Sequence, residues 1–128
     1  MKYYINKTIT ANFDQAIELV TEALKKEGFG VLSEIDIQHK LHEKLGVDFR
    51  KYKILGACNP ESAHKALQQE DKIGTMLPCN VILQETGENQ VEVAAVDPAA
   101  SMMAVDNEKL ASIAGEIKAK LERVIASL

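Results

Sequence analysis

The two cysteines of this sequence, Cys58 and Cys79, are its clearest candidates for chemistry, and each lies where an expected strand meets irregular chain. Each is followed by an asparagine, Asn59 or Asn80. Positions of this kind often hold binding or catalytic residues, because a rigid scaffold positions them. Cys58 directly precedes the expected N-cap of a helix, whose positive end lowers the pKa of a nearby thiol. Alternatively, Cys58 packs as a small apolar side chain, and the sequence leaves both interpretations open.

Two further residues, Asp97 and His64, extend this candidate site. A hairpin with a three-residue turn at 87–89 would place Asp97 opposite Cys79, so that a carboxylate and a thiol share a site. His64 lies near the start of the helix that follows Cys58. Two cysteines, a histidine and an aspartate could bind zinc or copper, but here they lack the short sequence spacing of such sites. We therefore expect no metal and no cofactor.

The composition argues against several kinds of partner. A formal net charge of −4, with Lys and Arg scattered among Asp and Glu, leaves no basic face for nucleic acid. Residues 1–7 lack the apolar region of a signal peptide, and no apolar run approaches the ~20 residues that span a bilayer. We expect a cytoplasmic protein without a membrane partner, in which both cysteines remain reduced.

The hydrophobic pattern predicts the elements that hold these residues. Alternation of apolar and polar residues predicts strands near 2–10, 29–37, 52–58, 79–86 and 90–97. Helical periodicity and capping residues predict helices after Asn12, from about Ile37 to Gly46, after Asn59, and from about Asn107 onward. The expected fold is a single α+β domain over residues 1–128, a two-layer sandwich whose five-stranded, largely antiparallel sheet is covered by helices.

The topology decides whether Cys58 and Cys79 can meet. A parallel crossover after Cys58 would start the next strand at the far end of the sheet, ~17 Å away. The connector at 71–78 is long enough to return the chain beside Cys58 in an antiparallel arrangement, which we favour. Gly56 interrupts the strand before Cys58, which indicates either close packing or the approach of a ligand, and we favour packing.

An ordered set of short motifs runs through nearly the whole chain: Gly28–Asp36, Lys44–Gly46, Ile54–Pro60, Leu77–Val81 and Asp97–Pro98. Together these motifs resemble the prokaryotic domain-of-unknown-function family 302. The resemblance implies a small, dimeric α+β domain from bacteria or archaea. Because the family has no established activity, the resemblance implies no catalytic residue.

Three functions remain for the candidate site. The first is a binding module for a small molecule at the ends of the strands that carry Cys58 and Cys79, where backbone amides, prolines and a glycine could line a pocket. The second is a thiol-dependent redox protein or enzyme that uses the same two cysteines. The third is an interaction domain with no catalytic site. The sequence does not decide whether the protein is an enzyme.

We also expect a homodimer. Apolar residues at alternate strand positions predict a second apolar face on the sheet, formed by Leu32, Leu55, Ile82, Ala94 and Val96. An apolar face in a soluble chain needs a cover, and a two-fold partner is the commonest one. The alternative is that the C-terminal helix or the helix at 37–45 covers this face within one chain.

Overall fold

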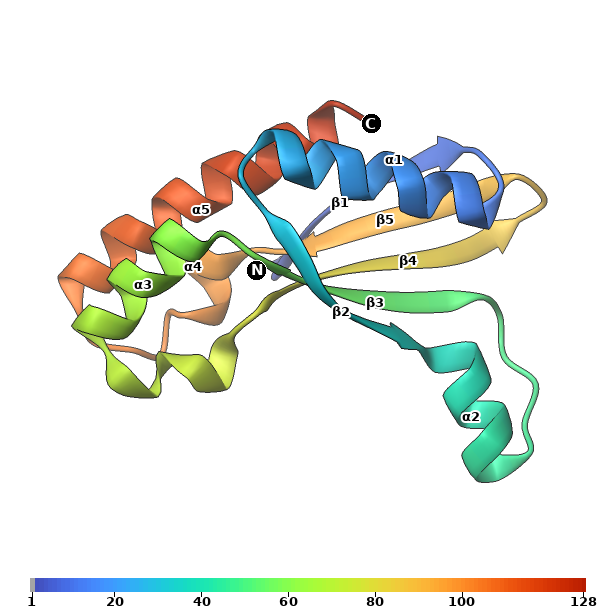
Figure 1. Cartoon of the computed structure of the whole chain (residues 1–128), viewed down its shortest axis with the longest axis horizontal. Helices are drawn as coiled ribbons and strands as arrows, with labels where there is room; N and C mark the ends of the chain where they lie inside the picture. Colours follow the sequence, from blue (N-terminus) through green and yellow to red (C-terminus); the bar gives the residue numbers. More distant parts are fainter. Residues whose placement is uncertain (1) are drawn as a thin grey trace.

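The sheet forms one layer of the structure and helices form the other. The computed structural model describes residues 2–128, and its five strands form one antiparallel sheet in the order β1-β5-β4-β3-β2. Helices α1 and α5 lie on one side of this sheet (Figure 1), which confirms the expected α+β fold. The elements along the chain are β1 (Tyr4–Thr10), α1 (Phe13–Lys26), β2 (Gly30–Asp36), α2 (Ile37–Leu45), β3 (Tyr52–Cys58), α3 (Pro60–Gln69), the 3₁₀ helix η1 (Asp71–Met76), β4 (Cys79–Gly87), β5 (Gln90–Val96), α4 (Pro98–Ser101) and α5 (Glu108–Ala126).

Helix α1 shows how local sequence signals position the covering layer. Asn12 Oδ1 accepts a hydrogen bond from the Gln15 N–H at 2.9 Å, and Gln15 Oε1 accepts one from the Asn12 N–H at 3.3 Å. This reciprocal capping box satisfies two amide groups that the first turn leaves unpaired. The core lies between the helices and the sheet, and its fully buried members include Val20, Leu24, Leu55, Val81, Leu83, Val93, Leu121 and Val124.

The other face of the sheet points away from α1 and α5, and we call it the open face. Its side chains form rows across the strands, because paired residues of neighbouring strands lie on the same face. Most of these side chains are at least partly exposed. One row contains Thr8, Glu92, Gln84 and Tyr52; the next contains Asn6, Ala94, Ile82, Ile54 and Ile35; the third contains Tyr4, Val96, Asn80, Gly56 and Ser33.

The sequence assigned one residue to the wrong face. Leu55 is fully buried under the helices together with Val81, whereas Ile54 lies on the open face opposite Ile82. Two apolar residues in succession fit either face of a strand, so alternation alone could not decide between them. The exposed Leu32 lies at an irregularity between Val31 and Ser33, where the pairing of β2 with β3 shifts its register.

The hairpin of β4 and β5 follows the predicted register over its central part. Leu83 pairs with Val93 and Val81 with Ala95, as expected. The predicted pairing at the turn was wrong, because Gly87 pairs with Gln90 after a register shift between Glu85 and Gly87. The bulge adds one residue to β4 between the turn and the central pairs. This extra residue compensates for the error at the turn, so the central pairs remain correct.

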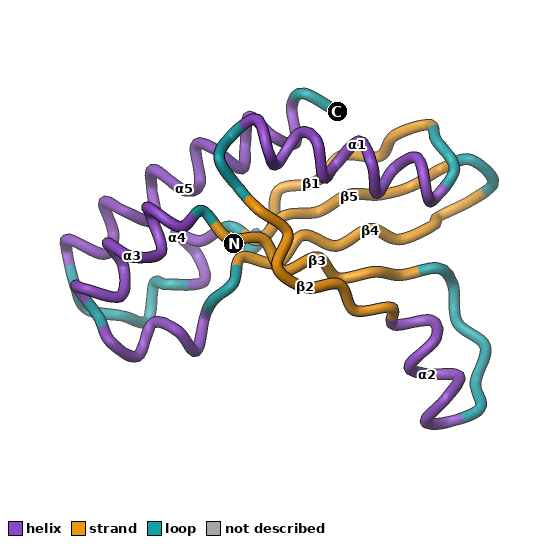
Figure 2. The backbone as a smooth tube through the Cα atoms, viewed as in Figure 1, coloured by secondary structure: helices purple, strands orange, loops and turns teal. Residues whose placement is uncertain are grey.

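Helix α2 and the loop after it extend away from the rest of the molecule. Figure 2 shows α2 at the lower right, beyond the end of β2, whereas α1 and α5 lie in the upper part of the view. Asp36 caps α2 by accepting a hydrogen bond from the His39 N–H at 2.9 Å, and Gly46 ends it in the left-handed region, with a φ of 67°. No residue of α2 is buried. We call α2 and the loop 46–51 the arm.

Replacing Gly56 with alanine should destabilise the protein. An alanine Cβ would lie 2.3 Å from Ser33 Oγ and 2.8 Å from Pro78 Cγ, so neighbouring side chains explain the glycine, as expected. Overpacking of this kind costs about 1–3 kcal/mol. The control is Gly115→Ala in α5, where nothing lies within 4 Å of the new Cβ and alanine should stabilise the helix by about 0.5–1 kcal/mol. Urea unfolding measures both changes, and equal effects would contradict the packing explanation.

Candidate functional site

Cys58 and Cys79 lie at the same end of the sheet. Strands β3 and β4 are antiparallel neighbours, with Ala57 opposite Cys79, which confirms the favoured topology. Both cysteines are free thiols; Cys79 is buried and Cys58 is half-buried. They help to line a cavity of about 10 Å³, together with Phe29 and Pro78. This volume holds about one water molecule, so the cavity has no room for an organic ligand.

Burial changes the chemistry of Cys79. Desolvation, with a smaller effect from neighbouring Cys58, raises the pKa of the Cys79 thiol from 9.0 to about 11. A thiol in apolar surroundings resists ionisation, because the thiolate would lose its hydration. At neutral pH Cys79 therefore carries its proton and is a poor nucleophile.

Asn59 has a structural role in the fold. Its Oδ1 accepts a hydrogen bond from the Ser62 N–H at 3.2 Å, which caps α3, and its Nδ2 donates to the Glu27 carbonyl at 3.3 Å. Asn59 is 8% exposed, so both ends of its amide are used inside the protein. An asparagine before Pro60 is a strong helix start, and here it also fixes the loop after α1.

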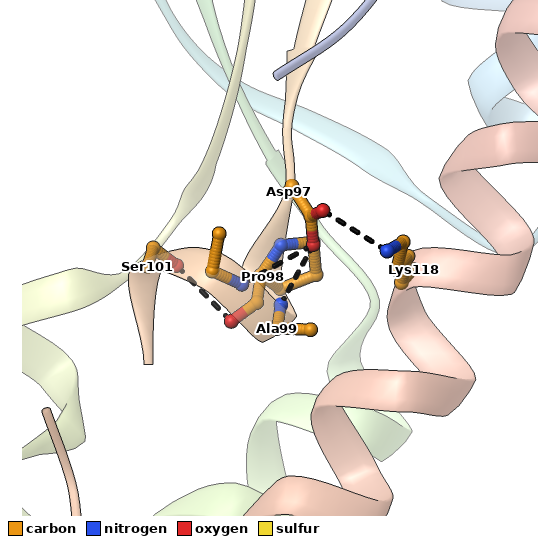
Figure 3. Close-up of polar contacts among 6 residues, drawn as sticks. Asp97, Pro98, Ala99, Ser101 and Lys118 are labelled. Atoms are coloured by element: carbon orange, nitrogen blue, oxygen red, sulfur yellow. Dashed lines mark hydrogen bonds and ion pairs between the residues drawn. The ribbon is translucent and has the colours of Figure 1, made fainter. Parts of the chain in front are cut away.

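Asp97 also contributes to the start of a helix. One carboxylate oxygen accepts hydrogen bonds from the N–H groups of Ala99 and Ala100, at 3.0 and 3.3 Å, and the other lies 3.1 Å from Lys118 Nζ (Figure 3). Its own N–H donates to the Tyr3 carbonyl at 2.8 Å, so the backbone of Asp97 extends the pairing with β1. The carboxylate therefore joins β5, α4 and α5.

The remaining candidates do not line the cavity beside the two cysteines. His64 is exposed on α3, and Asn80 is exposed on the open face. Within residues 2–128 no group of three or more His, Cys, Asp or Glu side chains could hold a metal ion. Of the candidate residues, only Cys58, Asn59 and Cys79 line the small cavity between β3 and β4.

A larger concave site lies on the open face, and we call it the trough. Its volume is about 420 Å³. All three tyrosines of the chain line it, and Ile82, Ala94 and Val96 form its apolar part. Of the candidates from the sequence, only Asn80 contributes to it. The residues that line the trough are Tyr3, Tyr4, Tyr52, Asn80, Ile82, Gln84, Glu92, Ala94, Ala95 and Val96.

A chain of hydrogen bonds crosses one end of the trough. Asn6 Nδ2 and Gln84 Nε2 each donate to a separate oxygen of Glu92, at 2.9 and 2.7 Å. Gln84 Oε1 in turn accepts from Arg50 Nε at 2.8 Å, and the Arg50 guanidinium lies 4.4 Å from the centre of the Phe49 ring. The four polar residues come from separate strands or loops, so only the sheet register brings them together.

The open face is almost free of charge. Glu92 is the only residue with a formal charge at pH 7 in the three rows defined above. The chain as a whole is 27% charged, and solvated sheet faces normally carry many polar and charged residues. This composition differs from that of an ordinary solvated sheet face, and alternation on known strands could have revealed it.

No helix within residues 2–128 combines the length and the apolar character that a membrane crossing needs. No curated protein matches the chain.

Comparisons with families and solved structures agree with the fold. Residues 5–128 match the family described as "Domain of unknown function DUF302". The crystal structure of an uncharacterized conserved protein DUF302 from Bacillus stearothermophilus is similar to this chain with a TM-score of 0.90 and 28% identity, over 98% of each chain. Because the family model matches almost every residue, the chain belongs to the DUF302 family.

Proposed function

We propose that the protein is a binding module for a small amphipathic molecule, and that the trough is its site. The observation that supports this best is the trough itself, because about 420 Å³ lies within the range of small-molecule pockets, roughly 300–1,000 Å³. The cavity beside Cys58 and Cys79, with about 10 Å³, is too small for the ligand expected there from the sequence. The proposed site is therefore displaced from the strand ends to the open face.

The lining of the trough favours a ligand with a flat apolar body and a polar head. Ile82, Ala94 and Val96 offer an apolar surface, and tyrosine rings stack on planar groups. At the polar end, Glu92 accepts hydrogen bonds and Gln84 links it to Arg50. Among the residues that line the trough only Glu92 is charged, and both of its oxygens already accept hydrogen bonds, so the trough favours a ligand without net negative charge.

A hollow of similar volume beside α1 supports binding less well. It measures about 430 Å³, but it is lined largely by exposed residues such as Gln15, Glu18, Leu19 and Glu22. Side chains that already face water lose hydration when a ligand covers them, which offsets much of the gain from contact. The trough has more apolar surface to cover.

The alternative of a thiol-dependent redox protein or enzyme at Cys58 and Cys79 has weaker support. Cys79 keeps its proton at neutral pH, since its pKa is raised to about 11. Nucleophilic thiols normally have a lowered pKa and an adjacent general base. The nearest carboxylate expected from the sequence, Asp97, is engaged by the N-terminus of α4 and by Lys118.

Binding of the uncharged dye N-phenyl-1-naphthylamine tests the proposal, because the dye has a flat apolar body and no net charge. Amide chemical-shift changes in an NMR titration should centre on Ile82, Ala94 and Val96. Ala94→Phe should fill the trough and weaken dye binding at least about tenfold, which is 1.4 kcal/mol. Leu19→Phe, at an exposed position on α1, is the matched control and should leave the affinity unchanged. Shifts that centre on α1 or on Cys58 and Cys79 would contradict the trough as the site.

A further inference from the structure

The trough has a carboxylate near one end and an aromatic ring near the other. Glu92, Ala94 and Val96 occupy alternate positions of β5 and all line the trough. Tyr4, on the neighbouring β1, pairs with Val96. Four residues along β5 and one strand across separate the Cα atoms of Glu92 and Tyr4 by roughly 14 Å. Between these ends the trough offers the apolar side chains of Ala94 and Ile82.

The carboxylate of Glu92 has only neutral partners. Asn6 Nδ2 donates to one of its oxygens at 2.9 Å, and Gln84 Nε2 donates to the other at 2.7 Å. Within residues 2–128 the carboxylate forms no ion pair with a Lys, Arg or His side chain. A carboxylate has about four lone-pair sites, so two of them remain free for further donors. A ligand with a positively charged N–H group would supply both a donor and an opposite charge.

The aromatic rings of the trough also attract positive charge. The face of a tyrosine ring is the negative part of its quadrupole, and cations bind there. Two cations of the chain already lie over such rings: Lys2 Nζ is 5.3 Å from the centre of the Tyr4 ring, and Arg50 Cζ is 5.9 Å from that of Tyr52. Tyr3 meets Tyr4 edge to face, with the ring centres 5.1 Å apart. The rings and the carboxylate therefore favour the same sign of charge.

Lys2 and Arg50 are the charges that would repel such a ligand. Both residues are exposed and neither lines the trough, so water and salt screen their charges. Arg50 lies in the arm, and Gln84 stands between its guanidinium and Glu92. Glu92 is half-buried and lines the trough directly, so its charge acts on a bound ligand at shorter range and through less water.

We infer that the ligand of the trough is an organic cation, a protonated amine whose positive head binds Glu92 and whose flat apolar body lies on Ala94 and Ile82. This inference rests on the proposed binding function and adds to it the sign of the ligand's charge and the residue that recognises it. A neutral molecule of the same shape would gain the apolar contacts alone. A negatively charged molecule would meet the Glu92 carboxylate, and like charges in contact weaken binding.

Three probes that share one naphthalene ring test the sign of the charge. At pH 7 the probe 1-naphthylmethylamine is a cation, 1-naphthylmethanol is uncharged and 1-naphthaleneacetate is an anion. Isothermal titration calorimetry at low salt measures the affinity of the wild-type protein for each. The cation should bind at least about tenfold more tightly than the alcohol, and the anion more weakly than the alcohol. Equal affinities for the cation and the alcohol would overturn the inference.

Glu92→Gln tests the residue that recognises the cation, because it removes the charge and keeps the size of the side chain. The affinity for the amine should fall at least about tenfold, whereas the affinity for the alcohol should stay unchanged. Glu22→Gln, at an exposed position on α1, makes the same change in net charge and is the matched control. It should leave all three affinities unchanged. A preference for the amine that survives Glu92→Gln, or that is lost in Glu22→Gln, would contradict the role of Glu92.

An NMR titration of the wild-type protein decides the site even if Glu92→Gln fails to fold. Amide shifts caused by the amine should centre on Glu92 and Ala94, and shifts that centre elsewhere would overturn the inference.

The preference for a cation and the proposed function can be separated. If the three probes bind in the trough with equal affinity, the binding function stands and the inference about charge fails. If Ala94→Phe leaves the binding of all three probes unchanged, the trough is not the site and both fail.

Discussion

Leu83→Ala should lower the free energy of unfolding by about 2–5 kcal/mol, whereas Ile82→Ala should lower it by about 1 kcal/mol or less. The two residues are neighbours on β4 and point to opposite faces of the sheet. Leu83 is fully buried under α1 and α5, so truncation leaves a cavity there. Ile82 is only partly buried, and water or nearby side chains can fill the space.

Urea unfolding of the wild type and the two variants at one protein concentration measures both changes. Similar losses for the two variants would show that the open face is packed as tightly as the covered face. The same outcome would contradict a trough whose side chains are open to solvent.

The folded protein should lose about 2–3 kcal/mol of stability between pH 9 and pH 11 through Cys79 alone. Burial raises the pKa of this thiol from 9.0 to about 11 in the folded chain. Between these values the unfolded chain releases the proton and the folded chain retains it, so rising pH favours unfolding. The stability is fully present below pH 9 and is lost as pH rises through 11. Each pKa unit corresponds to about 1.4 kcal/mol.

Comparison with Cys79→Ala isolates this effect from lysines and tyrosines that titrate in the same range. Urea unfolding at several pH values should give a steeper loss for the wild type than for Cys79→Ala. Cys58→Ala is the control, and it should keep most of the slope because Cys58 is the smaller cause of the raised pKa. Parallel curves for the wild type and Cys79→Ala would mean that the Cys79 thiol is hydrated in the folded protein.

Local signals were sufficient to predict the five strands and four of the five α-helices, with α4 the exception. Asn12 with Gln15, and Asn59 with Pro60, start helices through backbone hydrogen bonds that depend on only a few neighbouring residues. Such features need no knowledge of distant contacts, so one sequence contains them.

The trough could not be predicted in the same way. Its polar chain joins Asn6, Glu92, Gln84 and Arg50, which are far apart in sequence and meet only through the order of the strands. The face assignment of Ile54 and Leu55 had to be known first, and two adjacent apolar residues do not reveal it. The sequence pointed to the cysteines because thiols are reactive groups. In the structure, however, Cys79 is buried and protonated at neutral pH.

The edge position of β1 determines when the chain can complete its fold during synthesis. Strands β2 to β5 are neighbours in the sheet in the same order as in the sequence, but β1 pairs with β5, from Tyr4 opposite Val96 to Thr10 opposite Gln90. Of these five strands β1 leaves the ribosome first, and it must therefore wait for β5, the last of them. The Lys7 side chain on β1 also donates hydrogen bonds to the carbonyls of Ala126, the last residue of α5, and of Leu128. While it waits, β1 is an unpaired strand with Ile5 and Ile9 uncovered, and nascent chains are most prone to aggregate when such strands are exposed.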